Sequence, residues 1–231
     1  GKFAWSQIVS ADTITDEIKN QLPVLAANVR NLGSFKREVR KVQRQYATIA
    51  VMFGIVARYD AVVRWQSVAP AARDAFARAA ASSETADKKS YQEVKSRYDD
   101  LSELVRGESV EFEKPASESL WSDVAERRLL MLRLETAHNE RLRPLTANQQ
   151  EFDKNRSQVI HEAEIIAALA EVIQREEYEY YDDDDYLQYC RQIQQQARQV
   201  VEAASEKNFV EVQRNVGSIS KTCSGCHEGY K

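Results

Sequence analysis

A helical stripe of apolar residues occurs twice in this chain, and it constrains the fold more than any other feature. The stripe that ends at Cys223 has successive steps of 3, 4, 3 and 4 residues, which places its members on one face of a helix. A stripe with the same steps lies 118 residues earlier. The two sets are Phe209, Val212, Val216, Ile219 and Cys223, and Tyr91, Val94, Tyr98, Leu101 and Val105.

Other landmarks repeat in the same order. FKREVRKVQRQYATIAVMFGIVAR aligns with FDKNRSQVIHEAEIIAALAEVIQR. The landmark pairs are Trp5 and Trp121, Phe35 and Phe152, and Gly107 and Gly225, at separations of 116, 117 and 118 residues. Generic amphipathic helices can produce one matching stripe by coincidence, but the ordered landmarks favour a duplication. Small insertions in loops account for the drift in separation.

The periodicity predicts an all-α fold of two tandem four-helix up-and-down bundles, with domains at 1–117 and 118–231. Seven Gly and four Pro are too few for a chain built from many tight turns. Pro23 and Pro144 are expected to end or kink the first helix of each copy. The expected helices are 4–32, 35–62, 69–82 and 87–106, then 121–143, 149–178, 185–205 and 207–224.

Composition excludes two classes of partner. The net charge of −4 argues against a nucleic-acid binder, because phosphate affinity requires clustered Lys and Arg. The longest uncharged stretch, residues 45–57, is too short to cross a bilayer, which needs about 20 residues. We therefore expect a soluble protein without a membrane span, in which this stretch is a buried helix.

The end of the chain, KTCSGCHEGYK, contains the attachment signature of a c-type haem. On a helix, Cys223, Cys226 and His227 occupy positions i, i+3 and i+4 of one face. Two thioethers and one proximal iron ligand can then meet a single haem c. The first copy has Val105, Glu108 and Ser109 at the corresponding positions, so it is expected to be haem-free.

Other interpretations of the Cys-x-x-Cys pair remain open. A structural zinc site needs further ligands, and neither His138 nor His161 has the usual spacing of a second pair. A thioredoxin-like redox pair usually follows a strand and opens a helix, whereas this pair follows a helix. Cys190 stands alone and is expected to be a small buried apolar residue.

With this motif near its C-terminus, the sequence resembles the class II c-type cytochromes, the cytochrome c-prime family and its low-spin Met-ligated relatives. The resemblance covers Trp121 to Lys231 and includes the ending C-x-x-C-H-x-x-Tyr-Lys. It implies a four-helix bundle in which Tyr230 and Lys231 lie beside the proximal face of the haem. The segment DVAERRLLMLRL resembles the family's first helix, which implies that Arg127 contacts a propionate and that Met131 is the distal residue.

The distal residue separates two functions. In the family, Met at this position gives a six-coordinate, low-spin iron that transfers electrons, whereas an apolar residue leaves a five-coordinate iron that binds small gases such as NO and CO. Met131 can also be a flexible core residue like Met52. We expect an electron carrier with redox partner proteins rather than an enzyme. A five-coordinate gas-binding protein is the alternative.

Three expectations concern location and partners. Covalent haem attachment normally occurs outside the cytoplasm, so we expect a processed, exported protein, periplasmic or otherwise extracytoplasmic. Family members often form dimers through their first two helices, so the haem-free copy is expected to complete an internal pseudo-dimer, and a further homodimer is compatible with this.

The tract YEYYDDDDYLQY is interpreted as a loop leading into a helix, with a docking patch for a basic redox partner or a metal site as alternatives.

Overall fold

The computed structural model describes residues 3–116 and 119–230, and every regular element in these ranges is a helix. The predicted all-α class is therefore confirmed. The chain forms two compact units: unit 1 comprises Gly1–Ser6 and Ile14–Leu130, and unit 2 comprises Gln7–Thr13 and Met131–Lys231. Within the described ranges, no helix combines the length and the apolar character that a membrane crossing requires.

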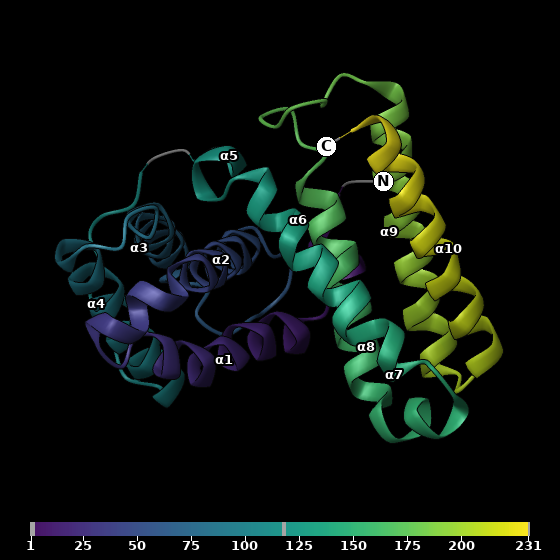
Figure 1. The fold of residues 1–231 in the computed structure, drawn as a ribbon, viewed down its shortest axis with the longest axis horizontal. Coiled ribbons are helices and arrows are strands. Elements are labelled where there is room, and N and C mark those ends of the chain that lie inside the picture. The colour runs from purple at the N-terminus through teal and green to yellow at the C-terminus, as the bar shows by residue number, and fades with distance from the viewer. Residues whose placement is uncertain (1–2, 117–118, 231) are drawn as a thin grey trace. The chain divides into compact units, whose positions relative to one another are not determined.

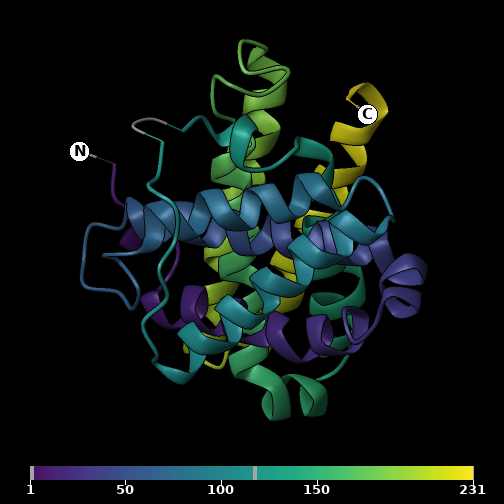
Figure 2. The ribbon, with the colours of Figure 1, turned by 90° about the vertical axis from the view of Figure 1, so that its left-hand side faces the viewer.

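Unit 1 is built around helix α2 (Figure 1). Every residue of α2 from Gln45 to Val56 is buried, which is the stretch that the sequence predicts to be a buried helix. Two aromatic rings of α2, those of Tyr46 and Phe53, stack on Phe76 of α3 with centroids 6.0 and 5.4 Å away. Figure 2 shows the helices of this unit from a second direction. The principal helices are α1 (Ala11–Asn28), α2 (Leu32–Ala57), α3 (Ala69–Ser82) and α4 (Lys88–Arg106).

Two short elements of unit 1, η1 (Trp5–Gln7) and α5 (Trp121–Val124), meet through their tryptophans. The rings of Trp5 and Trp121 are edge-on with centroids 5.8 Å apart, and the Arg58 guanidinium lies 4.6 Å from the Trp121 ring centroid. Gly54 of α2 allows this packing, because a Cβ there would lie 2.8 Å from Cζ3 of Trp121. Trp121 therefore belongs to unit 1, although the sequence assigns it to the second copy.

The division between the units differs from the predicted join. The join at 117/118 lies outside the described residues, and the units divide between Leu130 and Met131, within α6 (Arg127–Glu135). The packing of Trp121 on α2 accounts for the later division. Near the N-terminus, Ser10 belongs to unit 2 because its hydroxyl donates a 2.7 Å hydrogen bond to Glu164 of α8.

Unit 2 has one apolar core formed by four helical segments. Its centre includes Phe152 and Ile166 of α8, Val200 of α9 and Ile219 of α10. Glu162 is also buried there, and it pairs with Arg133 at 3.0 Å and with Arg141 at 2.6 Å. The elements are η2 (Thr136–Leu142, a π-helix), α7 (Arg143–Leu145), α8 (Gln149–Val172), α9 (Asp184–Ser205) and α10 (Phe209–Gly229).

The first predicted helix of each copy is interrupted. Residues 4–32 form η1 and α1, and residues 121–143 form α5, α6 and the π-helix η2, which leads into α7. Ala125 separates α5 from α6, because its backbone is extended at φ −156° and ψ 140°. Pro23 lies inside α1, which continues to Asn28, and Pro144 lies in the short α7.

The helices α2 and α8 begin with the same local contacts. Their N-caps, Asn31 and Asn148, accept hydrogen bonds from the backbone N–H groups of Ser34 at 2.8 Å and Glu151 at 2.9 Å. One turn later, a phenylalanine of each helix pairs with an aromatic ring of α4 or α10. These ring pairs are Phe35 with Tyr91 at 5.9 Å and Phe152 with Phe209 at 5.6 Å. All of these positions lie 117 or 118 residues apart.

Candidate functional site

The Cys-x-x-Cys-His motif occupies the last turns of α10. This helix begins at the N-cap Asn208, whose side chain accepts a hydrogen bond from the Glu211 N–H at 3.2 Å. The predicted apolar stripe faces the core of unit 2 and ends with Cys223, which packs against that core. The helix continues to Gly229, so both cysteines and His227 lie on one continuous helix. The spacing therefore places all three side chains within about one turn.

The two motif cysteines face inward. Cys226 is 5% exposed and Cys223 is half-buried, and no disulfide joins them. Burial, with a contribution from Cys226, raises the pKa of the Cys223 thiol to about 11. Redox-active Cys-x-x-Cys pairs instead have a lowered pKa, often at a helix N-terminus. The environment of Cys223 thus differs from that of a thioredoxin-like pair and keeps its thiol protonated at neutral pH.

His227 differs from the cysteines in its exposure. It follows Cys226 on the last turn of α10 and is exposed to solvent, whereas Cys226 is buried. An exposed imidazole next to inward-facing thiols leaves a nitrogen accessible to a metal. Two thiols and an imidazole at i, i+3 and i+4 form the donor set that a covalently attached haem requires, so these residues fit that group.

Tyrosines surround the end of α10. The ring of Tyr230 lies edge-on to Tyr180 and Tyr186, with centroids 5.1 and 5.3 Å away. Tyr189 of α9 covers the helix at Gly225, where a Cβ would lie 3.4 Å from the Tyr189 ring and hydroxyl. The segment before α9 and the first turns of α9 therefore supply the tyrosines around the end of α10. Residue 231, which the resemblance places beside the haem, lies outside the described residues.

Sequence reasoning missed the contact between the acidic tract and the motif helix. The Tyr230 hydroxyl donates a 2.7 Å hydrogen bond to Asp183, which lowers the pKa of the Asp183 carboxyl and raises that of Tyr230 to about 12. Asp183 is the N-cap of α9, a role that its place before the helical stripe could have indicated. The pairing with Tyr230 spans 47 residues, and no local pattern predicts it.

His138 sets the register between α10 and the segment formed by α6 and η2. Its Nε2 lies 3.0 Å from the Ser220 hydroxyl oxygen and 3.4 Å from the Val216 carbonyl oxygen. The two segments run in opposite directions in Figure 1. Met131 lies seven residues before His138, and the motif lies about seven residues after the contact point on α10. At about 1.5 Å per residue, Met131 and the motif are both about 10 Å from the His138 contact, in the same direction.

Met131 and His138 are seven residues apart, but the segment that contains them is not one regular α-helix. A regular α-helix would place residues seven apart on one face, but His138 lies in the π-helix η2, whose turns are wider. His138 is 6% exposed and also lies 3.0 Å from the Asn139 side-chain oxygen. It therefore acts as a structural link to α10. Met131 itself is half-buried and lies in unit 2.

The other residues singled out in the sequence differ in their burial. Arg127 is half-buried at the start of α6, on the unit 1 side of the division. Its neighbour Arg128 is exposed and lies 3.6 Å from Glu126. Cys190 is buried in α9, as expected, and His161 is half-buried in α8. In the described residues, no three His, Cys, Asp or Glu side chains gather into a metal-binding group.

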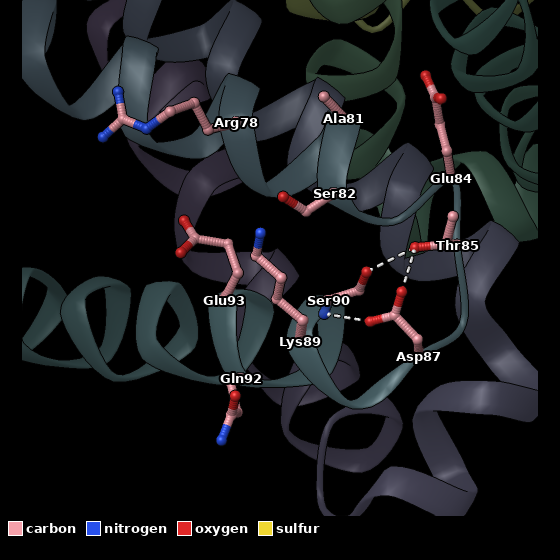
Figure 3. Close-up of a pocket in the computed structure, with 10 residues that line it drawn as sticks. All are labelled: Arg78, Ala81, Ser82, Glu84, Thr85, Asp87, Lys89, Ser90, Gln92 and Glu93. Atoms are coloured by element: carbon pink, nitrogen blue, oxygen red, sulfur yellow. Dashed lines mark hydrogen bonds between the residues drawn. The ribbon is translucent and has the colours of Figure 1, made fainter.

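A polar pocket in unit 1 lies between the end of α3 and the start of α4 (Figure 3). Asp87 caps α4 by accepting a 2.8 Å hydrogen bond from the Ser90 N–H. The Thr85 hydroxyl lies 3.1 Å from the other Asp87 oxygen and 2.7 Å from the Ser90 hydroxyl. These polar groups are thus paired with one another, and they stabilise the start of the helix.

Comparison of the chain with models of protein families, with curated proteins and with solved structures finds no match. The most specific feature is the set of two thiols and one imidazole at the end of α10.

Proposed function

We propose that this protein is a monohaem c-type cytochrome of the class II type, which carries electrons and holds its haem c on α10. The observation that carries the proposal is the donor set of two inward-facing thiols, which no disulfide joins, and an exposed imidazole within about one turn of α10. Cys223 and Cys226 would form the thioethers, and His227 would bind the iron. When bound, haem supplies one-electron exchange between ferrous and ferric iron.

The chain's own residues define the surroundings of this site. The buried position of Cys226 fixes the tethers at the edge of an apolar core, where the low dielectric affects the redox potential. Met131 lies in unit 2 with the motif, on the segment that His138 links to α10, and it would be the second protein ligand of the iron. A thioether ligand stabilises ferrous iron, raises the potential and closes the position at which a gas would bind. Arg127 is retained as the proposed propionate contact, and Tyr230 as a neighbour of the motif.

The proposal includes a duplication with one haem-binding copy, each copy being a four-helix bundle. The equivalent N-caps and ring pairs of α2 and α8 support it. In the first copy, α4 ends at Arg106, and Gly107 has a left-handed φ of 89°. Its counterpart, Gly225, lies inside α10, which continues through the motif. Unit 1 would then serve as a haem-free scaffold in an internal pseudo-dimer.

The proposed setting is extracytoplasmic, with redox proteins as partners, because thioether formation accompanies export. The test is the mass of the full chain after export together with a c-type haem-attachment system. We expect wild type and the matched control Cys190→Ala to gain the mass of one haem and to give the pyridine haemochrome spectrum of a haem with two thioethers. Cys223→Ala and Cys226→Ala should each give the spectrum of a haem with one thioether. A wild-type chain that carries no haem after such export would contradict the proposal.

A further inference from the structure

A hydrogen bond between two helix-capping residues fastens the last turn of α10 to the start of α9. Tyr230 is the C-cap of α10, and its hydroxyl donates to Oδ1 of Asp183 at 2.7 Å. Asp183 is the N-cap of α9, and the same oxygen accepts the N–H groups of Asp185 at 3.0 Å and Tyr186 at 3.1 Å. One carboxylate oxygen thus joins the two helix ends. We call the Asp183–Tyr230 contact the cap-to-cap bond.

The ring of Tyr230 is held from the side as well. Tyr186, which lies edge-on to it, is fully buried, and its hydroxyl donates to the Ile173 carbonyl oxygen just after α8 at 3.2 Å. Tyr180 packs on both rings, with centroids 5.5 Å from Tyr186 and 5.1 Å from Tyr230. The Tyr230 side chain is therefore fixed by contacts with the segment between α8 and α9, and its hydroxyl has a defined direction.

This bond acts on the turn that contains the motif. The Tyr230 N–H donates to the Cys226 carbonyl oxygen at 2.9 Å, which is the last backbone hydrogen bond of α10. The final turn of a helix frays readily because its carbonyl groups lack partners within the helix. A side-chain bond from the C-cap to a neighbouring helix opposes that fraying. It thereby restricts the orientation of Cys226 and of His227, which lies three residues before Tyr230.

We propose that Asp183 and Tyr230 are positioning residues that hold the Cys226–His227 turn in a fixed orientation. The expected effect of the cap-to-cap bond on the iron rests on the proposed function. Its expected effect on the orientation of Cys226 does not, because that effect is present in the chain without haem. The two parts can therefore be tested separately.

The first test uses the full-length chain produced without haem attachment, in which the alkylation rate of Cys226 is followed by peptide mass spectrometry. Tyr230→Phe removes only the hydroxyl, and Asp183→Asn retains a residue that caps helices well. We expect alkylation about threefold to tenfold faster in each variant. The double variant should react no faster than the single variants. The matched controls are Tyr181→Phe and Asp182→Asn, which change exposed neighbours and should leave the rate unchanged.

The second test uses the haem-loaded chain and measures the proton NMR shifts of the His227 ring and the reduction potential. Tyr230→Phe and Asp183→Asn should shift both, by similar and non-additive amounts, while the controls match wild type. Unchanged alkylation of Cys226 and unchanged His227 ring shifts in both variants would overturn the positioning role, even with haem attached. If wild type takes up no haem, the proposed function fails, and the alkylation rates still decide whether the cap-to-cap bond holds the turn.

Discussion

At the scale of single residues, the proposed iron ligand Met131 provides the test between electron transfer and gas binding. Met131→Ala removes the thioether, so we expect the sharp, split alpha band of the reduced protein to become a high-spin spectrum that responds to carbon monoxide. The reduction potential should fall, because the thioether stabilises ferrous iron. Visible spectroscopy and redox titration measure both effects.

The control for this prediction is Met52→Leu, which replaces a fully buried methionine of unit 1 with the residue at its repeat counterpart, Leu169. Its spectrum should match wild type. Identical spin states in wild type and Met131→Ala would show that Met131 is a core residue. An open, gas-responsive spectrum in wild type would favour the alternative function.

The buried His138 is expected to make the free energy of unfolding depend on pH. Burial lowers the pKa of His138 below its ordinary value of about 6.5, and the nearby positive charge of Arg143 acts in the same direction. The unfolded chain therefore binds a proton more readily than the folded chain in the window just below 6.5. Stability due to this group is present above that value and is lost as the pH falls through the window, with a slope of at most about 1.4 kcal/mol per pH unit.

Chemical denaturation between pH 7.5 and 5 tests this prediction. His138→Gln should weaken that pH dependence, whereas the half-buried His161→Gln should retain it. If wild type and His138→Gln lose stability in parallel as the pH falls, the pKa of His138 is not the cause.

Some site residues could be predicted from the sequence and others could not, and the difference is how far apart in the sequence their contacts lie. Cys223, Cys226 and His227 could be predicted because their chemistry depends on spacing within one helix. The link of Tyr230 to Asp183 depends on how two distant segments pack, which periodicity does not report. The role of Arg127 is implied only by the family resemblance, and its neighbour Arg128 lies near Glu126.

At the scale of elements, we expect the substitution of glycine by alanine to have opposite effects on stability at two positions. A Cβ at Gly54 would lie 2.8 Å from Cζ3 of Trp121, so Gly54→Ala should destabilise unit 1 by about 1–3 kcal/mol. Gly217 is exposed on α10 with nothing near its Cβ position, so Gly217→Ala should stabilise the chain by about 0.5–1 kcal/mol. Thermal and denaturant unfolding measure both.

The clash with Trp121 can be isolated with a second substitution. In a Trp121→Phe background the offending ring atom is absent, so the penalty for Gly54→Ala should shrink. If Gly54→Ala lowers stability equally in both backgrounds, the loss comes from the backbone of α2 and not from the contact with Trp121.

Helix positions were predictable where the apolar pattern runs without interruption. The predicted range 69–82 agrees with α3, and 87–106 agrees with α4 to within one residue. The first helices were predicted less well, because the pattern continues through the extended Ala125 and through the π-helix η2. These interruptions depend on tertiary packing, such as Trp121 on α2 and His138 on α10, which local propensity does not encode.

At the scale of the whole molecule, each unit has its own apolar core. In unit 1, aromatic rings of α2 and α3 stack in the interior, and in unit 2 aliphatic and small residues of α8, α9 and α10 predominate. Separate cores predict separate local stability, because an apolar contact stabilises only the elements that it joins. Phe35 and Phe152, which occupy equivalent places and are both fully buried, provide a matched pair for testing this.

We expect Phe35→Leu to cost about 1 kcal/mol and to accelerate amide hydrogen exchange about fivefold in α2 and α4, because it weakens the ring pair with Tyr91. Phe152→Leu should produce the reciprocal pattern in α8 and α10, where its ring pairs with Phe209. Each variant is the control for the other, and mass spectrometry of exchanged peptides resolves both regions. Equal acceleration along the whole chain in both variants would mean that the two cores unfold as one cooperative structure, and a haem-free unit 1 would then stabilise unit 2 directly.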